Sequence, residues 1–133
     1  MRDGVVLYAD VYRPSDEGPW PIIVARAPYG KSGTYENSFL DPLTAIRQGL
    51  IAVIQDVRGR YASGGYTWQP GAADAHEGFD TIAWAASLSG SNGRVGMWGP
   101  SYMGNVQWPR ARSTSTCGRP ARCSRPATAS GCT

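Results

Sequence analysis

The sequence predicts an α/β fold in which a parallel β-sheet is covered by helices on both faces. Short apolar runs rich in β-branched residues alternate with stretches of helical spacing along most of the chain. The last of these runs ends in a glycine, which is followed by a proline, a serine and residues compatible with a helix. This order indicates a sharp turn from a strand into a helix.

The individual elements follow from hydrophobic spacing and from glycine or proline at their ends. Asp3-Gly4 is typical of a tight turn that precedes a strand. Gly49 fits the end of the first helix, and the stretch 90–93 (GSNG) is expected to be a turn. The expected strands are Val5–Arg13, Pro21–Ala27, Ile51–Val57 and Val95–Trp98, and the expected helices are Phe39–Leu50 and Asp74–Leu88.

The chain divides into two unlike parts at Trp108. Residues 1–108 have a formal net charge of −2, whereas residues 109–133 have five arginines and no acidic residue. The second part also lacks Val, Ile, Leu, Met and aromatic residues, so it has little to bury and is expected to be disordered. We interpret 1–108 as a truncated α/β domain and 109–133 as the product of a shifted reading frame; a genuine basic linker is the alternative.

Composition also limits the possible partners and cofactors. Cys117, Cys123 and Cys132 all lie in the tail, at spacings that fit no usual zinc site, so we expect no metal. The acidic balance of the domain gives no reason to expect a nucleic-acid partner. No apolar run is long enough for a membrane helix and no signal peptide is visible, so a cytoplasmic location without membrane contact is expected.

Ser101 has the sequence context of a nucleophile. The segment Gly99-Pro-Ser-Tyr-Met-Gly104 follows an apolar strand, and such a turn presents a serine hydroxyl above a parallel sheet. The usual pattern is G-x-S-x-G, and here the second glycine comes one position late, so by itself the segment also fits a turn of small residues. In the first interpretation, the backbone N–H of Tyr102 would stabilise the oxyanion that forms during acyl transfer.

Other polar residues are weaker candidates for catalysis. His76 is the single histidine and it precedes the serine, whereas the histidine of an α/β-hydrolase triad follows it, so a surface position is favoured. Asp56 and Arg58 follow a strand and are expected to form an ion pair that shapes the loops of the site.

Five segments together resemble the X-Pro dipeptidyl-peptidase-like hydrolases (peptidase S15, CocE/NonD), which include cocaine-esterase-like and α-amino-acid ester hydrolases. They occur in the order found in that family and span nearly all of the first 108 residues, which makes the chain resemble an N-terminal fragment of such an enzyme. The family has the turn G-x-S-Y-x-G, which is the spacing found here. The segments are 1–14 (MRDGVVLYADVYRP), 26–31 (RAPYGK), 55–65 (QDVRGRYASGG), 77–86 (EGFDTIAWAA) and 92–104 (NGRVGMWGPSYMG).

The resemblance implies the first part of an α/β-hydrolase fold, up to the turn that carries the nucleophile. It implies that Ser101 is the nucleophile, that the N–H of Tyr102 is one oxyanion donor and that the hydroxyl of Tyr29 is the other. From its sequence context alone, Tyr29 would be a loop tyrosine that covers the end of the sheet. The resemblance further implies a small ester or peptide substrate, a serine acyl-enzyme and no cofactor.

No histidine or carboxylate follows Ser101 in the 133 residues, so the triad acid and base are missing from this chain. We therefore expect the chain alone to be inactive. Two alternatives stay open: the arginine-rich tail could bind acidic partners, or a second chain could complete the fold.

Overall fold

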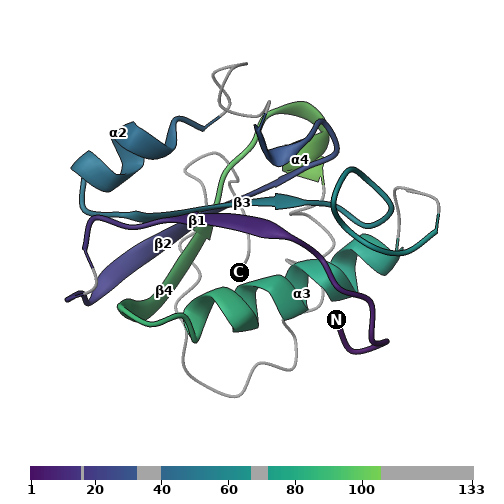
Figure 1. Ribbon diagram of the computed structural model, residues 1–133, viewed down its shortest axis with the longest axis horizontal. Coiled ribbons are helices and arrows are strands. Elements are labelled where there is room, and N and C mark those ends of the chain that lie inside the picture. The colour runs from purple at the N-terminus through teal and green to yellow at the C-terminus, as the bar shows by residue number, and fades with distance from the viewer. Residues whose placement is uncertain (16, 33–39, 67–71, 106–133) are drawn as a thin grey trace, which may run out of the picture.

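The computed structural model describes residues 1–15, 17–32, 40–66 and 72–105 (Figure 1). All the strands and helices expected from the sequence are present in this part of the chain, with somewhat different ends. In chain order they are β1 (Ala9–Tyr12), β2 (Trp20–Ala27), α2 (Pro42–Arg47), β3 (Ile51–Asp56), α3 (Ala72–Ala86), β4 (Ser91–Met97) and α4 (Ser101–Asn105). Phe39 and the whole tail 109–133, with the predictions made for them, lie outside the described residues.

The four strands form one mixed sheet in the order β1-β3-β2-β4. Strands β2, β3 and β4 are parallel, as the sequence predicts, whereas β1 runs antiparallel to β3. The sheet is therefore mixed: the alternation of strands and helices, which predicts parallel pairing, begins with β2 and does not include β1. Only the residues from Arg13 to Pro19 join β1 to β2. This connection is too short for the crossover that would let β1 run in the same direction as β2 and β3.

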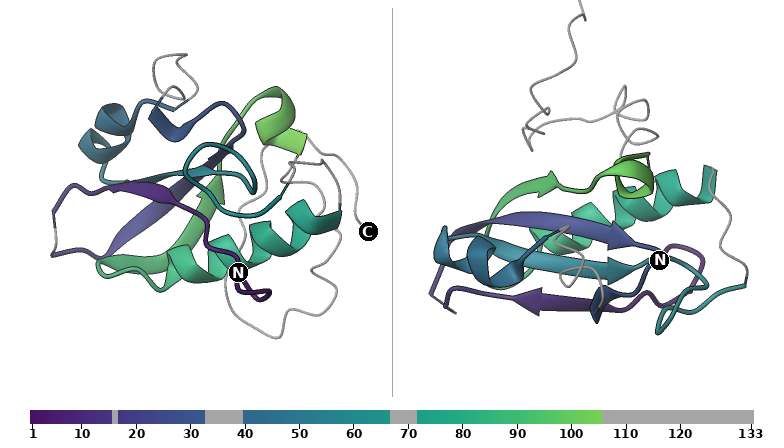
Figure 2. Two further views of the ribbon diagram at one scale, coloured as in Figure 1. Left: turned by 45° about the vertical axis from the view of Figure 1, so that its right-hand side comes forward. Right: turned by 90° about the horizontal axis from the view of Figure 1, so that it is seen from above.

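Helices cover both faces of the sheet because alternate residues of each strand point to opposite sides. Figures 1 and 2 show α3 on one face and α2 with α4 on the other. The core is accordingly split into two clusters of buried side chains. The cluster under α3 contains Ile22, Val24, Ile51, Val53, Ile82, Ala85 and Val95, and the cluster under α2 and α4 contains Ala25, Ala27, Leu40, Ala45, Ala52, Ile54 and Met103.

Local signals at the ends of α2 agree with its observed bounds. The carboxylate of Asp41 accepts the backbone N–H groups of Leu43 (3.0 Å) and Thr44 (3.1 Å), as an N-cap residue does. Gly49 has a φ of 73°, the left-handed conformation that commonly ends a helix. Both end signals lie inside the expected range Phe39–Leu50, so the observed helix is shorter than that range at each end.

Strand β4 begins at Ser91, earlier than expected, so most of the predicted turn at 90–93 belongs to the strand. Gly93 has a φ of 77°, and the pairing of β4 with β2 shifts register between Trp20 and Ile22. Such an irregularity lets a glycine with turn-like geometry sit inside a paired strand. In the described sheet β4 is the last strand in the order, next to β2.

We expect acid to destabilise this domain, and Asp41 provides a specific test. The hydroxyl of Thr44 and the N–H groups of Leu43 and Thr44 donate to its carboxylate, and these hydrogen bonds lower the pKa of Asp41. A carboxyl group whose pKa is lower in the folded state stabilises the fold above its unfolded pKa of about 3.9, and this contribution is lost as the pH falls through the folded pKa.

The Asp41→Asn variant should therefore keep most of its stability at pH 7, because asparagine is also a good N-cap. Its melting temperature should fall less steeply than that of the parent chain between about pH 5 and pH 3. Thermal unfolding followed by circular dichroism across this range makes the comparison. Parallel pH curves for the two proteins would contradict the role given to Asp41.

Candidate active site

Ser101 lies on a sharp turn between β4 and α4. The strand ends at Met97 and the helix begins at Ser101, so three residues make the whole connection. Ser101 has a φ of 52°, a left-handed conformation that non-glycine residues seldom adopt, and its side chain is exposed. Strained residues of this kind cluster at functional sites, because the surrounding structure has to hold them in place. The turn therefore presents the serine hydroxyl outward at the carboxyl end of a parallel strand.

Two glycines make room for this turn. A Cβ atom on Gly99 would lie 2.3 Å from the Cβ of Met103, and a Cβ on Gly104 would lie 3.0 Å from the carbonyl oxygen of Gly99. Met103 is only 1% exposed and belongs to the core cluster under α4. The late second glycine in the sequence is thus explained: position 103 holds a core side chain, and Gly104 faces the strand end.

Replacing Gly99 by alanine is expected to destabilise the domain by about 2–4 kcal/mol, because a contact of 2.3 Å adds overpacking to a strained backbone. Gly93→Ala is the matched control. Gly93 also has a positive φ, of 77°, but a Cβ there would meet nothing within 4 Å. The control should lose only about 1 kcal/mol, the cost of the backbone conformation. Urea denaturation of both variants measures the difference, and equal losses would contradict the steric explanation.

Tyr29 lies at the same edge of the sheet as Ser101. Strands β2 and β4 are parallel neighbours, with Val24 opposite Met97, and the N–H of Trp98 donates to the carbonyl of Val24 at 2.8 Å. The segments that follow the two strands therefore leave the sheet side by side, as Figures 1 and 2 show for α4 and the segment after β2. The Tyr29 side chain is 45% exposed. The structure thus brings the two predicted residues to neighbouring strand ends.

Tyr102 is the second residue of α4. The first four N–H groups of a helix have no carbonyl partner within that helix, and the N–H of Tyr102 is one of them. It immediately follows the exposed serine, which is where a donor to a developing oxyanion is needed.

Of the other polar candidates, His76 lies at the surface as expected, whereas Asp56 and Arg58 have partners that were not expected. His76 is exposed on α3, which packs on the face opposite to α4. The ion pair expected between Asp56 and Arg58 is wrong. Arg58 instead binds the carboxylates of Glu77 and Asp3, because its side chain turns back towards α3. The carboxylate of Asp56 accepts backbone N–H groups on the other side of the sheet.

A buried polar network under the sheet was missed by the sequence analysis. Arg26 on β2 is fully buried, and it donates to Glu77 on α3 (3.0 Å) and to Gln55 on β3 (3.1 Å). Thr81 also donates to Gln55, at 2.9 Å. Arginine and glutamine inside apolar strand runs were the available signal, since such residues are seldom buried without partners.

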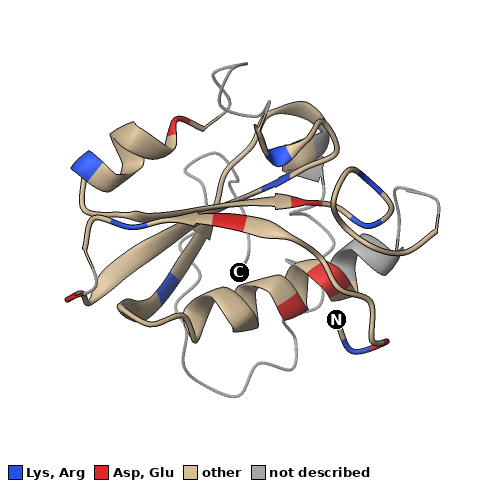
Figure 3. Ribbon diagram, in the orientation of Figure 1, with Lys and Arg blue, Asp and Glu red and all other residues tan. Residues whose placement is uncertain are grey.

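The network continues to the first residues of the chain. Asp3 accepts from Arg58 at 2.6 Å, and Asp80 on α3 accepts from Arg2, also at 2.6 Å. The side-chain hydrogen bond from Arg2 is the main cause that lowers the pKa of Asp80. Figure 3 shows the resulting mixture of acidic and basic positions where α3 meets the start of the chain. The network is structural, since it lies on the α3 face and not at the turn.

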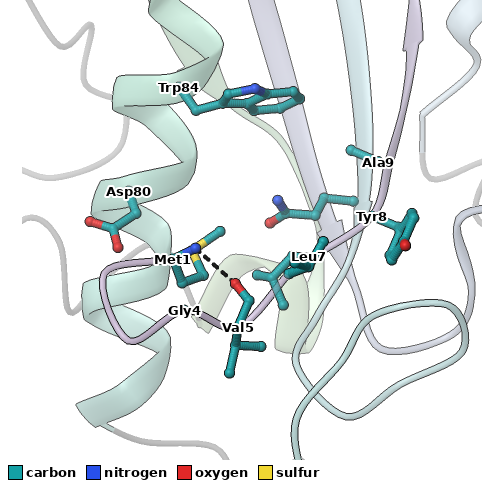
Figure 4. Close-up of a pocket in the computed structure, with 10 residues that line it drawn as sticks. Met1, Gly4, Val5, Leu7, Tyr8, Ala9, Asp80 and Trp84 are labelled. Atoms are coloured by element: carbon teal, nitrogen blue, oxygen red, sulfur yellow. Dashed lines mark hydrogen bonds between the residues drawn. The ribbon is translucent and has the colours of Figure 1, made fainter.

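A cavity of about 460 Å³ lies between the segment before β1 and α3 (Figure 4). Three of the polar groups that line it have partners: the ammonium group of Met1 donates to the carbonyl of Val5 at 2.8 Å, Asp80 accepts from Arg2, and Gln55 accepts from Arg26. The cavity adjoins β1, at the end of the strand order opposite to β4. It is therefore separate from the turn that carries the serine.

Two further features are absent from the part of the chain that the structure describes. The described residues hold no group of three or more His, Cys, Asp or Glu side chains placed to bind a metal ion. Among the same residues, no helix has the length and apolar character that crossing a membrane requires.

Comparisons with known proteins agree with this geometry. A family profile described as X-Pro dipeptidyl-peptidase (S15 family) matches residues 3–116, and so reaches past Trp108, where we expected the resemblance to stop. The cocaine esterase of Rhodococcus sp. (strain MB1 Bresler) is 41% identical over 115 residues, which are 85% of this chain and 20% of the esterase. The chain thus spans about a fifth of the length of this curated relative.

Solved structures give the same result. A CocE/NonD family hydrolase from Staphylococcus aureus matches with a TM-score of 0.76 at 28% identity, over 86% of this chain and 24% of that protein. An aminopeptidase from a marine sediment archaeon, Thaumarchaeota archaeon, matches with a TM-score of 0.67 at 29% identity, over 82% of this chain and 21% of that protein. The fold is therefore part of a CocE/NonD-type α/β fold, and the chain belongs to the X-Pro dipeptidyl-peptidase (S15) family.

Proposed function

We propose that this chain carries the nucleophile and the oxyanion donors of a serine hydrolase that cleaves acyl esters or amides. The observation that carries the proposal is the exposed Ser101 with a φ of 52°, on a three-residue turn at the carboxyl end of a parallel strand. Membership of a family that includes a cocaine esterase supports the same chemistry. The substrate would be a small ester or a peptide.

In the proposed reaction, the Oγ atom of Ser101 attacks the carbonyl carbon of the substrate while a base takes the serine proton. The negative charge that develops on the carbonyl oxygen is stabilised by the N–H of Tyr102 and the hydroxyl of Tyr29. The tetrahedral intermediate expels the alcohol or amine, which takes up the proton, and an acyl-serine is left. Water then attacks the acyl carbon while the base takes a proton from it, the bond between that carbon and Oγ breaks as Oγ takes up the proton, and the carboxylic acid is released.

The base of this reaction is not supplied after Ser101 in the present sequence, since residues 102–133 contain no histidine, aspartate or glutamate. His76 lies on α3, on the opposite face of the sheet from α4. We therefore propose that the acid and the base come from residues outside this chain, and that the chain alone does not turn over substrate.

A hybrid enzyme tests the proposal. Residues 3–108 of this chain replace the segment that they match in the Rhodococcus cocaine esterase, which then supplies the remainder of the fold. We expect the hybrid to hydrolyse an activated ester such as p-nitrophenyl acetate with a burst of one acyl group per protein. Mass spectrometry should locate that acyl group on Ser101. A folded hybrid without turnover, or with the acyl group on another residue, would overturn the proposal.

A further inference from the structure

The segment that carries Tyr29 is held from one side by the loop that follows β3. We call residues 28–31 the tyrosine segment and residues 57–65 the β3 loop; both begin at the carboxyl ends of parallel neighbouring strands. Three contacts join them. Two reach the residues on either side of Tyr29, Pro28 and Gly30, and the third reaches Lys31. Because they lie on both sides of Tyr29, these contacts fix its backbone.

The first contact is made by Asp56, the last residue of β3. Its Oδ1 atom accepts the N–H of Lys31 at 2.6 Å and its Oδ2 atom accepts the N–H of Ala62 at 3.3 Å, so that one carboxylate joins the two segments. Asp56 is 1% exposed, and none of the salt bridges among the described residues includes it. A buried carboxylate that accepts backbone N–H groups holds those segments in place, because its hydrogen bonds are satisfied in only one arrangement of the chain.

The second and third contacts lie on the other side of Tyr29. The Nε atom of Arg60 donates to the carbonyl oxygen of Pro28 at 3.1 Å. The ring of Tyr61 lies against Gly30, where an added Cβ would come within 3.1 Å of the ring. Gly30 has a φ of 92°, so the position requires glycine both for its backbone and for its space.

The β3 loop is itself well anchored, so it can serve as a fixed support. The hydroxyl of Ser63 donates to the carbonyl of Asp56 at 2.7 Å and accepts the N–H of Tyr8 at 2.9 Å. The N–H of Gly64 donates to the carbonyl of Val6 at 2.9 Å, and the N–H of Gly59 donates to the carbonyl of Gly64 at 3.0 Å. The loop is thus attached to the strand it follows and to the segment before β1.

We propose that Asp56 and Arg60 are positioning residues for the hydroxyl of Tyr29. The inference rests on the proposed function, in which that hydroxyl donates to the oxyanion. An oxyanion donor has to lie about 2.7–3.1 Å from the oxygen it stabilises, and a displacement of about 1 Å can lower the rate about 100-fold. The two residues therefore affect the rates of acylation and deacylation, which both pass through an oxyanion, without touching the substrate.

The first test uses the complete 133-residue chain and needs no turnover. In the Asp56→Asn variant, one of the two acceptor oxygens becomes an NH2 donor, so the N–H of Lys31 or of Ala62 loses its acceptor, and we expect that amide to exchange with solvent about tenfold faster or more. Asp41→Asn is the matched control, because Asp41 also accepts two backbone N–H groups but belongs to α2. Unchanged exchange at both Lys31 and Ala62, or an equal acceleration of these two amides in the Asp41→Asn control, would overturn the inference.

The second test is a double-mutant cycle in the hybrid enzyme. Asp56→Asn should lower kcat by about 10- to 100-fold and leave KM within about twofold, as expected for an interaction made in the transition state. In the Tyr29→Phe background the same change should have little further effect, because the hydroxyl it positions is gone. An equal loss in both backgrounds would show a merely structural role and would overturn the inference.

Arg60 gives an independent variant, since its side chain is exposed and its replacement leaves the core intact. Arg60→Met should lower kcat in the hybrid that retains Tyr29 but not in the Tyr29→Phe hybrid. Arg60→Lys keeps a hydrogen-bond donor, so its kcat should lie between those of the parent hybrid and Arg60→Met. The two proposals fail differently. A hybrid without turnover on Ser101 contradicts the proposed function, whereas a hybrid that needs Ser101 but not Asp56 and Arg60 contradicts only this inference.

Discussion

The Ser101→Ala variant of the hybrid enzyme is expected to lose turnover of p-nitrophenyl acetate by about 10⁶-fold, the loss seen when a catalytic serine is removed from a triad. The variant lacks the atom that forms the acyl bond, so the burst should also disappear. A residual rate of about 10³–10⁴ over water can persist through the oxyanion donors. Initial rates and burst amplitudes measured at equal protein concentration make the comparison.

Ser89→Ala is the control for this variant, because Ser89 is an exposed serine in the turn before β4. It should keep the parental rate and burst. The folded state of both variants is checked by circular dichroism, since Ser101 has strained backbone geometry and its replacement can alter stability. A Ser101→Ala hybrid that retained a full burst would remove the basis of the proposed function.

Replacing Glu77 by alanine should have the largest effect on stability, about 3–5 kcal/mol, because it breaks a buried ion pair by removing one partner. Glu77 is 3% exposed and binds both Arg26 and Arg58. Its removal takes away the carboxylate to which the fully buried guanidinium of Arg26 donates. The hydrogen bond that Arg58 donates to Glu77 is also the main reason that the pKa of Arg58 is raised, so the second arginine loses its principal partner as well.

Urea denaturation of the parent chain and the variant gives the free energy of unfolding. Glu17→Ala is the matched control, because Glu17 is exposed and such surface changes usually alter stability by less than about 0.5 kcal/mol. A loss below about 1 kcal/mol in Glu77→Ala would contradict the assignment, since an uncompensated buried charge costs more than that.

The sequence predicted the alternation of strands and helices well, because burial on both sheet faces produces continuous apolar runs, such as the first four residues of β3. It did not predict the direction of β1. The residues Ala9–Tyr12 have the same pattern in either direction, and only the length of the connection to β2 decides between them. The turn predicted before Val95 was wrong for a similar reason, since a positive φ at Gly93 is compatible with both a turn and an irregular strand.

The candidate site was predicted unevenly. Ser101 could be found from its local sequence, because a strand, a glycine and a helix start in immediate succession indicate the turn. Tyr29 required the family resemblance, since a tyrosine in a loop has many other uses. The partners of Asp56 and Arg58 could not be predicted, because the direction of a side chain after a strand end depends on the path of the loop. That path brings Arg58 to Glu77 and leaves Asp56 facing Lys31.

The position of β4 beside β2 has a consequence for folding kinetics. Tyr29 and Ser101 come together only when β4 docks on β2, after the intervening β3 and α3 have formed their own connections. Pairings between segments so distant in sequence form slowly, because the loop between them must close first. A partly folded species that lacks docked β4 would keep the β1-β3-β2 strands but have no assembled site. Recovery of Ser101-dependent acylation during refolding of the hybrid should therefore lag behind recovery of secondary structure.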